Sequence, residues 1–206
     1  MIGYYNYTVI LTYIGTFFGF VGVTYASGDN FRMALICLII AGFCDMFDGK
    51  IASTMKRTKE EKMFGIQIDS LSDLICFGLL PALIAHRSVG REMMNTAICG
   101  MYLLCALVRL AWFNVDEELR QNQEDGGRER YLGLPVTTSA ILVPLAYGGL
   151  NLLKLPVDKI LPWVMLVIAV AFVSPVQLKK PKLVGKLIML VIGIGGLACV
   201  ILGVKP

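Results

Sequence analysis

The chain has 206 residues, of which 56% are hydrophobic and 17% are charged. Soluble domains are about 45–50% apolar, so this composition excludes an ordinary soluble fold and requires an apolar solvent around much of the surface. The net charge of +4 is modest, and no nucleic-acid partner is expected. Such a charge fits a membrane protein with basic loops beside an anionic leaflet.

Seven apolar segments follow one another along the chain, several of them near the roughly 20 residues that an α-helix needs to cross a hydrocarbon core. They predict an all-α fold, a polytopic transmembrane helix bundle in a single membrane domain covering 1–206. The sixth segment is short and is bounded by Pro162 and Pro175, so a six-span alternative with part of 156–175 at the membrane interface stays open. The segments are Thr8–Ala26, Phe31–Ala52, Gly65–Ala85, Met93–Phe113, Leu134–Leu152, Ile160–Pro175 and Leu183–Val204.

Basic residues are concentrated in three connections that share one side of the predicted bundle. The positive-inside rule places this side and the N-terminus in the cytoplasm, which predicts a multi-pass protein of the cell membrane. The opposite side carries Arg87, Arg91, Lys154 and Lys159. The cytoplasmic set is Lys56, Arg57, Lys59 and Lys62 in 53–64, Arg120, Arg128 and Arg130 in 115–132, and Lys179, Lys180, Lys182 and Lys186 in 176–186.

Four aspartates lie where two apolar segments approach the first basic loop. Asp45 and Asp48 are three residues apart, and Asp69 and Asp73 are four apart, so each pair shares one helix face. The loop between the two segments is short, which predicts antiparallel neighbours with all four carboxylates at one depth.

A carboxylate inside a helix at membrane depth costs roughly 2.5–3.5 kcal/mol on insertion scales, and four that converge also repel one another. Divalent Mg²⁺ or Mn²⁺ prefers oxygen ligands and removes both costs. Two such ions about 3.5–4 Å apart can clamp the attacking and leaving oxygens of a phosphoryl displacement. Two other interpretations stay open: helix-end residues at the interface, and a proton or ion relay.

Written as a pattern, the region reads Asp45-x2-Asp48-Gly49-x2-Ala52-Ser53, a spacer, then Gly65-x3-Asp69-x3-Asp73. This signature region, residues 45–73, resembles the pattern of the CDP-alcohol phosphatidyltransferases, D-x2-D-G-x2-A-R followed by G-x3-D-x3-D. The resemblance implies a CDP-alcohol donor such as CDP-diacylglycerol, two divalent cations and a homodimer in the membrane lipid. It also implies that Asp45, Asp48, Asp69 and Asp73 ligate metal and that Asp73 acts as the general base.

The resemblance also implies substrate contacts near the signature. Gly49 lies where the nucleotide approaches the helix backbone, and Asn6 and Thr8 resemble a loosely aligned element beside the cytidine site, with helix capping as the alternative. Ser53 stands where the family usually has an arginine that helps to bind the donor diphosphate. The nearby cations Lys50, Lys56 and Arg57 are the candidates to replace that charge, and Lys62 is a further candidate substrate contact.

The acceptor is predicted from three further runs that are similar to those of phosphatidylserine synthases. They are Phe64–Ala82, Arg109-Leu110-Ala111-Trp112-Phe113-Asn114 and Gly133-Leu134-Pro135, with Trp112 in place of a second arginine. Arg109 is a charge within an apolar segment, which by default suggests function. Its guanidinium suits a serine carboxylate or a donor phosphate. The alternative is that the side chain only extends to the membrane interface and contacts no substrate.

Asn114 is the other candidate for a substrate contact in this run, unless it simply ends the helix. The expected activity is the transfer of a phosphatidyl group from CDP-diacylglycerol to serine. Transfer to another alcohol, such as glycerol phosphate or inositol phosphate, is the near alternative. An ion-binding transporter is the distant one.

Overall fold

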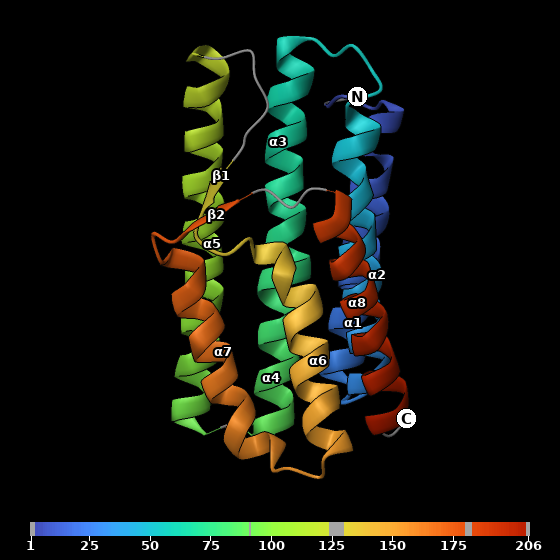
Figure 1. The fold of residues 1–206 in the computed structure, drawn as a ribbon, viewed down its shortest axis with the longest axis vertical. Helices are drawn as coiled ribbons and strands as arrows, with labels where there is room; N and C mark the ends of the chain where they lie inside the picture. The colour runs from blue at the N-terminus through green and yellow to red at the C-terminus, as the bar shows by residue number, and fades with distance from the viewer. Residues whose placement is uncertain (1–2, 91, 124–129, 180–182, 205–206) are drawn as a thin grey trace.

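The computed structural model describes residues 3–90, 92–123, 130–179 and 183–204. Over these residues the chain forms long helices that run side by side along one axis, with the N- and C-termini at opposite ends (Figure 1). The helices are α1 (Ile10–Ser27), α2 (Phe31–Ala52), α3 (Lys59–Asp73), α4 (Leu80–Val89), α5 (Met93–Gln123), α6 (Ser139–Leu152), α7 (Val157–Val173) and α8 (Leu183–Gly203). The shorter elements are the 3₁₀ turns η1 (Tyr7–Val9) and η3 (Val136–Thr138), the π-helix η2 (Leu74–Leu79), and the strands β1 (Arg130–Leu132) and β2 (Gln177–Lys179).

The predicted all-α bundle is confirmed, because each apolar segment contains one helix when α3, η2 and α4 are taken as one continuous helix. The segment predicted at Phe31–Ala52 has the bounds of α2. The helix predicted to begin at Gly65 begins earlier, at Lys59, because a capping box starts it. Thr58 accepts the backbone N–H of Glu61 at 3.2 Å, and the Glu61 carboxylate accepts the backbone N–H of Thr58 at 2.9 Å.

The weakest predicted segment forms a full helix, which favours the seven-helix interpretation over six spans. Helix α7 lies beside α5 in the bundle (Figure 1). It buries Leu161, Met165, Ile168 and Phe172 completely or nearly so. Pro162 lies inside this helix near its start and does not end it.

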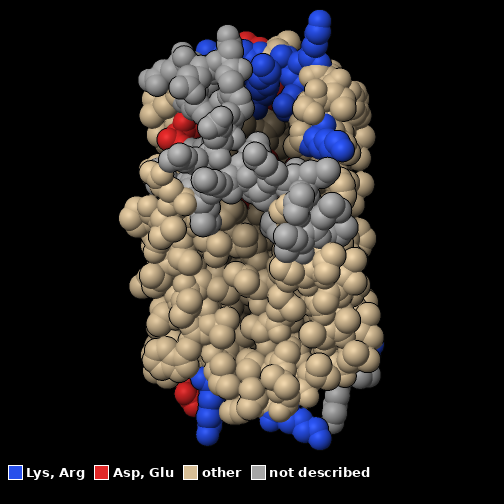
Figure 2. Space-filling model, in the orientation of Figure 1, with Lys and Arg blue, Asp and Glu red and all other residues tan. Residues whose placement is uncertain are grey.

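The molecule has the surface of an integral membrane protein. Three of the described helical stretches are long and apolar enough to cross a membrane, namely Tyr7–Ser27, Lys59–Val89 and Met93–Leu119. Figure 2 shows Lys and Arg gathered at the two ends of the molecule, with a broad band of uncharged surface between them. Large side chains are exposed on the long helices, among them Phe17 (64%) and Phe20 (62%), as expected for surfaces that face lipid.

The first basic connection lies at the opposite end of the bundle from the connections predicted to face the other side. The N-terminus, the α2–α3 connection and the end of α5 lie at one end, whereas the α1–α2, α4–α5 and α6–α7 connections lie at the other (Figure 1). The basic residues of 53–64 therefore share an end with the N-terminus. Of the other basic residues named above, Arg91, Arg128, Lys180 and Lys182 lie outside the described residues.

A short antiparallel ladder, not predicted from the sequence, joins the α5–α6 and α7–α8 connections. Strand β1 pairs with β2, with Tyr131 opposite Leu178. Gly133 follows at φ +75°, and its N–H donates to the carbonyl of Val176 at 2.8 Å. A Cβ at Gly133 would lie 2.6 Å from the carbonyl oxygen of Phe172, so glycine lets this connection lie against the end of α7.

Small residues bring α1 close to the helices that carry the aspartates. Gly15, Gly19 and Gly22 are buried. A Cβ at Gly19 would lie 2.6 Å from Sγ of Cys76, and one at Gly15 would lie 3.3 Å from Cβ of Cys44. This packing places the polar residues of α1 against the carboxylates of α2 and α3.

Candidate active site

Three of the four predicted carboxylates converge in one group. One carboxylate oxygen from each of Asp45, Asp48 and Asp69 lies within 4.8 Å of the other two. Asp73 stands outside this group but is 8% exposed and lines the same small cavity. The structure therefore brings three of the four predicted acids together, and Asp73 lines the same cavity outside that group.

The cavity between these carboxylates has a volume of about 10 Å³, which is roughly the space of one water-sized sphere. Helices α1, α2 and α3 and the π-helix η2 enclose it. Its lining residues are Leu11, Thr12, Gly15, Ala41, Cys44, Asp45, Asp48, Asp69, Ser72, Asp73, Cys76 and Phe77.

The donor set fits a hard divalent cation. Among the described residues, the group that could hold a metal consists of carboxylates alone, and oxygen ligands are those that Mg²⁺ and Mn²⁺ prefer. The thiol of Cys76, which lines the cavity, instead lies 3.4 Å from the carbonyl of Gly15. Within the described part of the chain, no Lys or Arg nitrogen lies within 4.0 Å of these carboxylates, so no basic side chain balances their charge as a bound cation would.

Helix α1 contributes hydroxyl groups that the sequence interpretation missed. Thr12 donates to Oδ2 of Asp48 at 3.4 Å, and Thr16 donates to the hydroxyl of Ser72 at 2.7 Å. Ser72 in turn lies 3.5 Å from the backbone carbonyl of Thr12. The signal was present in the sequence, because Thr8, Thr12 and Thr16 recur every four residues and so share one helix face.

Asn6 and Thr8 lie where the N-terminal segment meets the α2–α3 connection. The side chain of Asn6 caps η1 by accepting from the backbone N–H and the hydroxyl of Thr8. Its amide also donates to Glu61 at 3.3 Å. Tyr7 and Thr54 share a hydrogen bond of 3.0 Å close by. The capping alternative is thus realised for Asn6, and Thr8 is 3% exposed.

The predicted donor-binding residues lie at the end of α2 and in the connection that follows it. Lys50 and Lys62 are exposed, and the hydroxyl of Ser53 donates to the carbonyl of Lys50 at 2.7 Å. Gly49 is exposed, and no atom lies within 4 Å of where its Cβ would be. Open space beside this backbone leaves room for a ligand to approach it.

Arg57 differs from the exposed lysines, because its guanidinium turns toward the helix that carries Asp69. One of its terminal nitrogens lies 3.1 Å from the position that a Cβ of Gly65 would take. Gly65 is one helical turn before Asp69 and therefore shares its face. Among Lys50, Lys56 and Arg57, the cation placed on the carboxylate-bearing face of α3 is Arg57.

Asn114 connects α5 to the carboxylate-bearing helix. Its side-chain oxygen accepts from the hydroxyl of Ser70 at 2.6 Å, and its amide donates to Gln67 at 3.4 Å. Ser70 follows Asp69 directly in α3. Asn114 lies inside α5 and does not end that helix.

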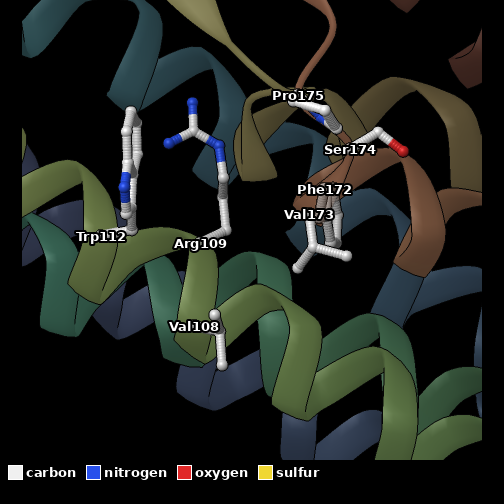
Figure 3. A pocket seen from close by; sticks show the side chains of 7 residues that line it. All are labelled: Val108, Arg109, Trp112, Phe172, Val173, Ser174 and Pro175. Atoms are coloured by element: carbon white, nitrogen blue, oxygen red, sulfur yellow. The ribbon is translucent and has the colours of Figure 1, made fainter.

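Arg109 lines a second cavity of about 260 Å³, between α5 and the end of α7 (Figure 3). The residue is 6% exposed, and its guanidinium lies 5.6 Å from the ring centre of Trp112, a cation–π distance. Figure 3 shows Arg109 and Trp112 on one side, facing Phe172–Pro175 on the other. The described residues that line this cavity and those that line the carboxylate cavity do not overlap.

Several known proteins have sequences similar to this chain. The CDP-diacylglycerol–serine O-phosphatidyltransferase of Helicobacter pylori (strain ATCC 700392 / 26695) is 30% identical over 143 residues, which are 68% of this chain and 56% of that protein. The protein of that name from Saccharomyces cerevisiae (strain ATCC 204508 / S288c) is 36% identical over 112 residues, 53% of this chain and 40% of that protein. The archaetidylserine synthase of Methanothermobacter thermautotrophicus is 27% identical over 139 residues, 67% of this chain and 56% of that protein.

The chain thus spans about half the length of the curated relatives it matches. The family model described as CDP-alcohol phosphatidyltransferase matches residues 5–174, a range that contains the four aspartates, Arg109 and Asn114. The chain therefore belongs to the CDP-alcohol phosphatidyltransferase family.

Proposed function

We propose that this chain transfers the phosphatidyl group of CDP-diacylglycerol to the hydroxyl of L-serine, giving phosphatidylserine and CMP. The observation that carries the proposal is the convergence of Asp45, Asp48 and Asp69 within 4.8 Å in apolar helices. The family match supports the reaction class, and the names of the relatives from Helicobacter pylori and Saccharomyces cerevisiae support serine as the acceptor. In this proposal 1–206 acts as one catalytic domain.

The cofactors that we propose are two divalent cations, Mg²⁺ or Mn²⁺, held by Asp45, Asp48, Asp69 and Asp73. When bound, they would supply positive charge that offsets the carboxylates and the donor diphosphate. The oxygen-only donor group supports hard cations over softer ones.

Asp73 is the residue proposed to receive the proton of the serine hydroxyl. It lines the carboxylate cavity but stands outside the group of three, so we propose that one of its carboxylate oxygens ligates a cation while the other accepts the substrate proton. The serine oxygen bonds to the phosphorus that carries diacylglycerol. The bond from that phosphorus to the CMP oxygen breaks, and CMP leaves with the electron pair.

The donor is proposed to bind with its acyl chains in lipid and its cytidine diphosphate at the bundle end that carries the N-terminus. Gly49 offers open backbone there. Lys50 and Ser53 lie at the same end of α2, Arg57 lies in the connection that follows, and Lys62 lies at the start of α3. Asn6 caps η1 and donates to Glu61 in the first turn of α3, and Thr8 lies in η1. The basic residues of 53–64 support a cytoplasmic location of this end in the cell membrane.

For the acceptor we propose that Arg109 binds the serine carboxylate. It is a cation that is more than nine-tenths buried and lines a cavity of about 260 Å³, and a guanidinium suits a carboxylate. Asn114 lies on the same helix and contacts Ser70 beside Asp69, so α5 links this cavity to the carboxylates. The homodimer stays an expectation from the family.

The test is an acceptor panel on the purified chain in lipid nanodiscs with CDP-diacylglycerol. Labelled serine, glycerol phosphate and inositol phosphate are offered in turn, with Mg²⁺ and with Mn²⁺. We expect a lipid product with serine and with neither of the other acceptors. That product should be phosphatidylserine, with one CMP released for each molecule formed. A lipid product with a different acceptor would reassign the substrate, and the absence of CMP release under every condition would contradict the transferase assignment.

A further inference from the structure

The helix that carries Asp69 and Asp73 changes its winding immediately after Asp73. Residues Leu74–Leu79 form the π-helix η2, between α3 and α4. A π-turn contains more residues than an α-turn, and one added residue rotates the following helix by about 100° relative to the preceding one. If α4 keeps its place in the bundle, the winding of η2 therefore decides the direction in which Asp69 and Asp73 point.

The far end of this helix is held firmly by the rest of the bundle. In α4, Leu80, Ile84 and Ala85 have no exposed surface. The rotation of α3 relative to this packed helix is consequently controlled at η2.

Two side chains from other helices bind a single carbonyl in η2. The hydroxyl of Tyr102 in α5 donates to the carbonyl oxygen of Phe77 at 2.8 Å, and the hydroxyl of Ser139 in α6 donates to the same oxygen at 3.2 Å. Tyr102 and Ser139 have no exposed surface, so water cannot replace either bond. Losing a buried hydrogen-bond partner is costly.

The same segment contacts the carboxylate cavity with its other side. Phe77 lines that cavity, together with Cys76. The thiol of Cys76 donates a hydrogen bond to the carbonyl of Gly15 in α1 at 3.4 Å. The π-helix is thus held between α1 on the cavity side and the hydroxyls of Tyr102 and Ser139 on the other.

We propose that Tyr102 and Ser139 are positioning residues for the carboxylate site. By holding the Phe77 carbonyl they keep η2 in its π winding, which turns Asp69 and Asp73 toward Asp45 and Asp48. Neither hydroxyl touches the reacting groups, and their action passes through the backbone. The inference rests on the proposed metal-dependent function.

The test compares Mn²⁺ affinity and kinetics of full-length variants in nanodiscs. Mn²⁺ binding is followed by electron paramagnetic resonance, without substrate. The double variant Tyr102→Phe with Ser139→Ala removes both donors and leaves the Tyr102 ring against Phe172, where the ring centres are 5.3 Å apart. We expect Mn²⁺ affinity to fall about tenfold, given the cost of unmade buried hydrogen bonds, and kcat to fall more than the KM for serine rises.

The matched control is Tyr147→Phe. Tyr147 is a buried tyrosine of α6 whose ring packs against Phe31, the first residue of α2, and it is not among the described residues that line the carboxylate cavity. It should lose thermal stability to a similar degree while keeping its Mn²⁺ affinity and kcat. Ser139→Thr retains a hydroxyl and should keep a higher Mn²⁺ affinity than Ser139→Ala.

Mn²⁺ affinity and kcat of the double variant within twofold of those of Tyr147→Phe would overturn the proposal. If the double variant does not fold, Tyr102→Phe alone is compared with Tyr147→Phe by the same criterion. Failure of the proposed function is distinguishable, because a wild-type chain that binds Mn²⁺ but releases no CMP would refute the transferase and leave the affinity comparison valid.

Discussion

The hydroxyl of Thr12 lies 3.4 Å from Oδ2 of Asp48, so a third helix touches the carboxylate group. Thr12 is 7% exposed, and its bond restricts the orientation of the Asp48 carboxylate. Thr16, one turn further along α1, donates to the hydroxyl of Ser72, the residue before Asp73. Helix α1 therefore contacts an acid of α2 directly and reaches α3 through a serine next to Asp73.

Replacing Thr12 by Val should lower kcat about tenfold, because a hydrogen bond to a charged group contributes about 1.5–3 kcal/mol. Valine has nearly the same shape, so the packing against α2 is kept. The measurement is CMP release at saturating substrate. Thr24→Val is the control, since Thr24 is exposed and its hydroxyl donates to the Val21 carbonyl within its own helix. Equal rates for the two variants would contradict a role for Thr12.

Loss of a group that only supports a metal ligand costs up to about a hundredfold in activity. Replacing Asp69, a proposed ligand itself, by Asn should therefore reduce transfer by at least that factor. The amide keeps the size of the side chain but removes a charge from the group of three. Activity is measured beside the helical signal in circular dichroism, which should be retained. Asp158→Asn, an exposed acid in the first turn of α7, should behave as wild type. Substantial transfer by Asp69→Asn would count against the metal scheme.

Chelation should abolish activity reversibly. Hard oxygen sites bind Mg²⁺ and Mn²⁺ through ionised carboxylates, so EDTA should remove the ions without unfolding the bundle. Adding excess Mg²⁺ or Mn²⁺ should restore CMP release. Activity that persists at full rate in EDTA would show that the carboxylates act without metal.

Arg109→Gln should raise the KM for serine about tenfold or more, because charge-assisted hydrogen bonds are roughly twice as strong as neutral ones. The KM for CDP-diacylglycerol should change little. Lys154→Gln, an exposed cation just beyond α6, is the control. If Arg109 only stabilises the end of α7 through its packing, the variant will lose thermal stability with an unchanged KM for serine.

Gly19→Ala should destabilise the protein by about 1–3 kcal/mol, the usual cost of overpacking. The new Cβ would lie 2.6 Å from Sγ of Cys76. Gly100→Ala is the matched control, since Gly100 is exposed and has no atom within 4 Å of that position. Thermal unfolding in detergent measures both, and Gly19→Ala combined with Cys76→Ala should recover most of the loss. Equal stabilities for the two single variants would refute the close packing of α1.

The carboxylate group could be predicted because its geometry is local. Spacings of three and four residues fix each pair on one helix face, and a short connection fixes the two helices as neighbours. Thr12 and Thr16 were missed because hydroxyls in apolar helices commonly bond the backbone of their own helix, so their presence does not indicate a contact with another helix. Thr16 does so as well, at 2.8 Å to the Thr12 carbonyl.

The π-helix and the place of Arg109 could not be predicted in this way. An apolar run such as Leu74–Leu79 has the same composition in α and π winding, and its donors Tyr102 and Ser139 lie 25 and 62 residues from Phe77 in sequence. Arg109 is positioned by the end of α7 and by Gly133, which are distant in sequence. Its separate cavity depends on tertiary packing.

Glu61 accepts two bonds at once, from the Thr58 backbone at 2.9 Å and from the Asn6 amide at 3.3 Å. One carboxylate therefore ties the amino-terminal residues to the start of the helix that carries Asp69 and Asp73. An affinity tag fused ahead of Asn6 would disturb the hydrogen bonds at that helix start. A tag at the carboxyl-terminal end, on the far side of the bundle (Figure 1), would leave it undisturbed, and purification for metal-binding measurements should place it there.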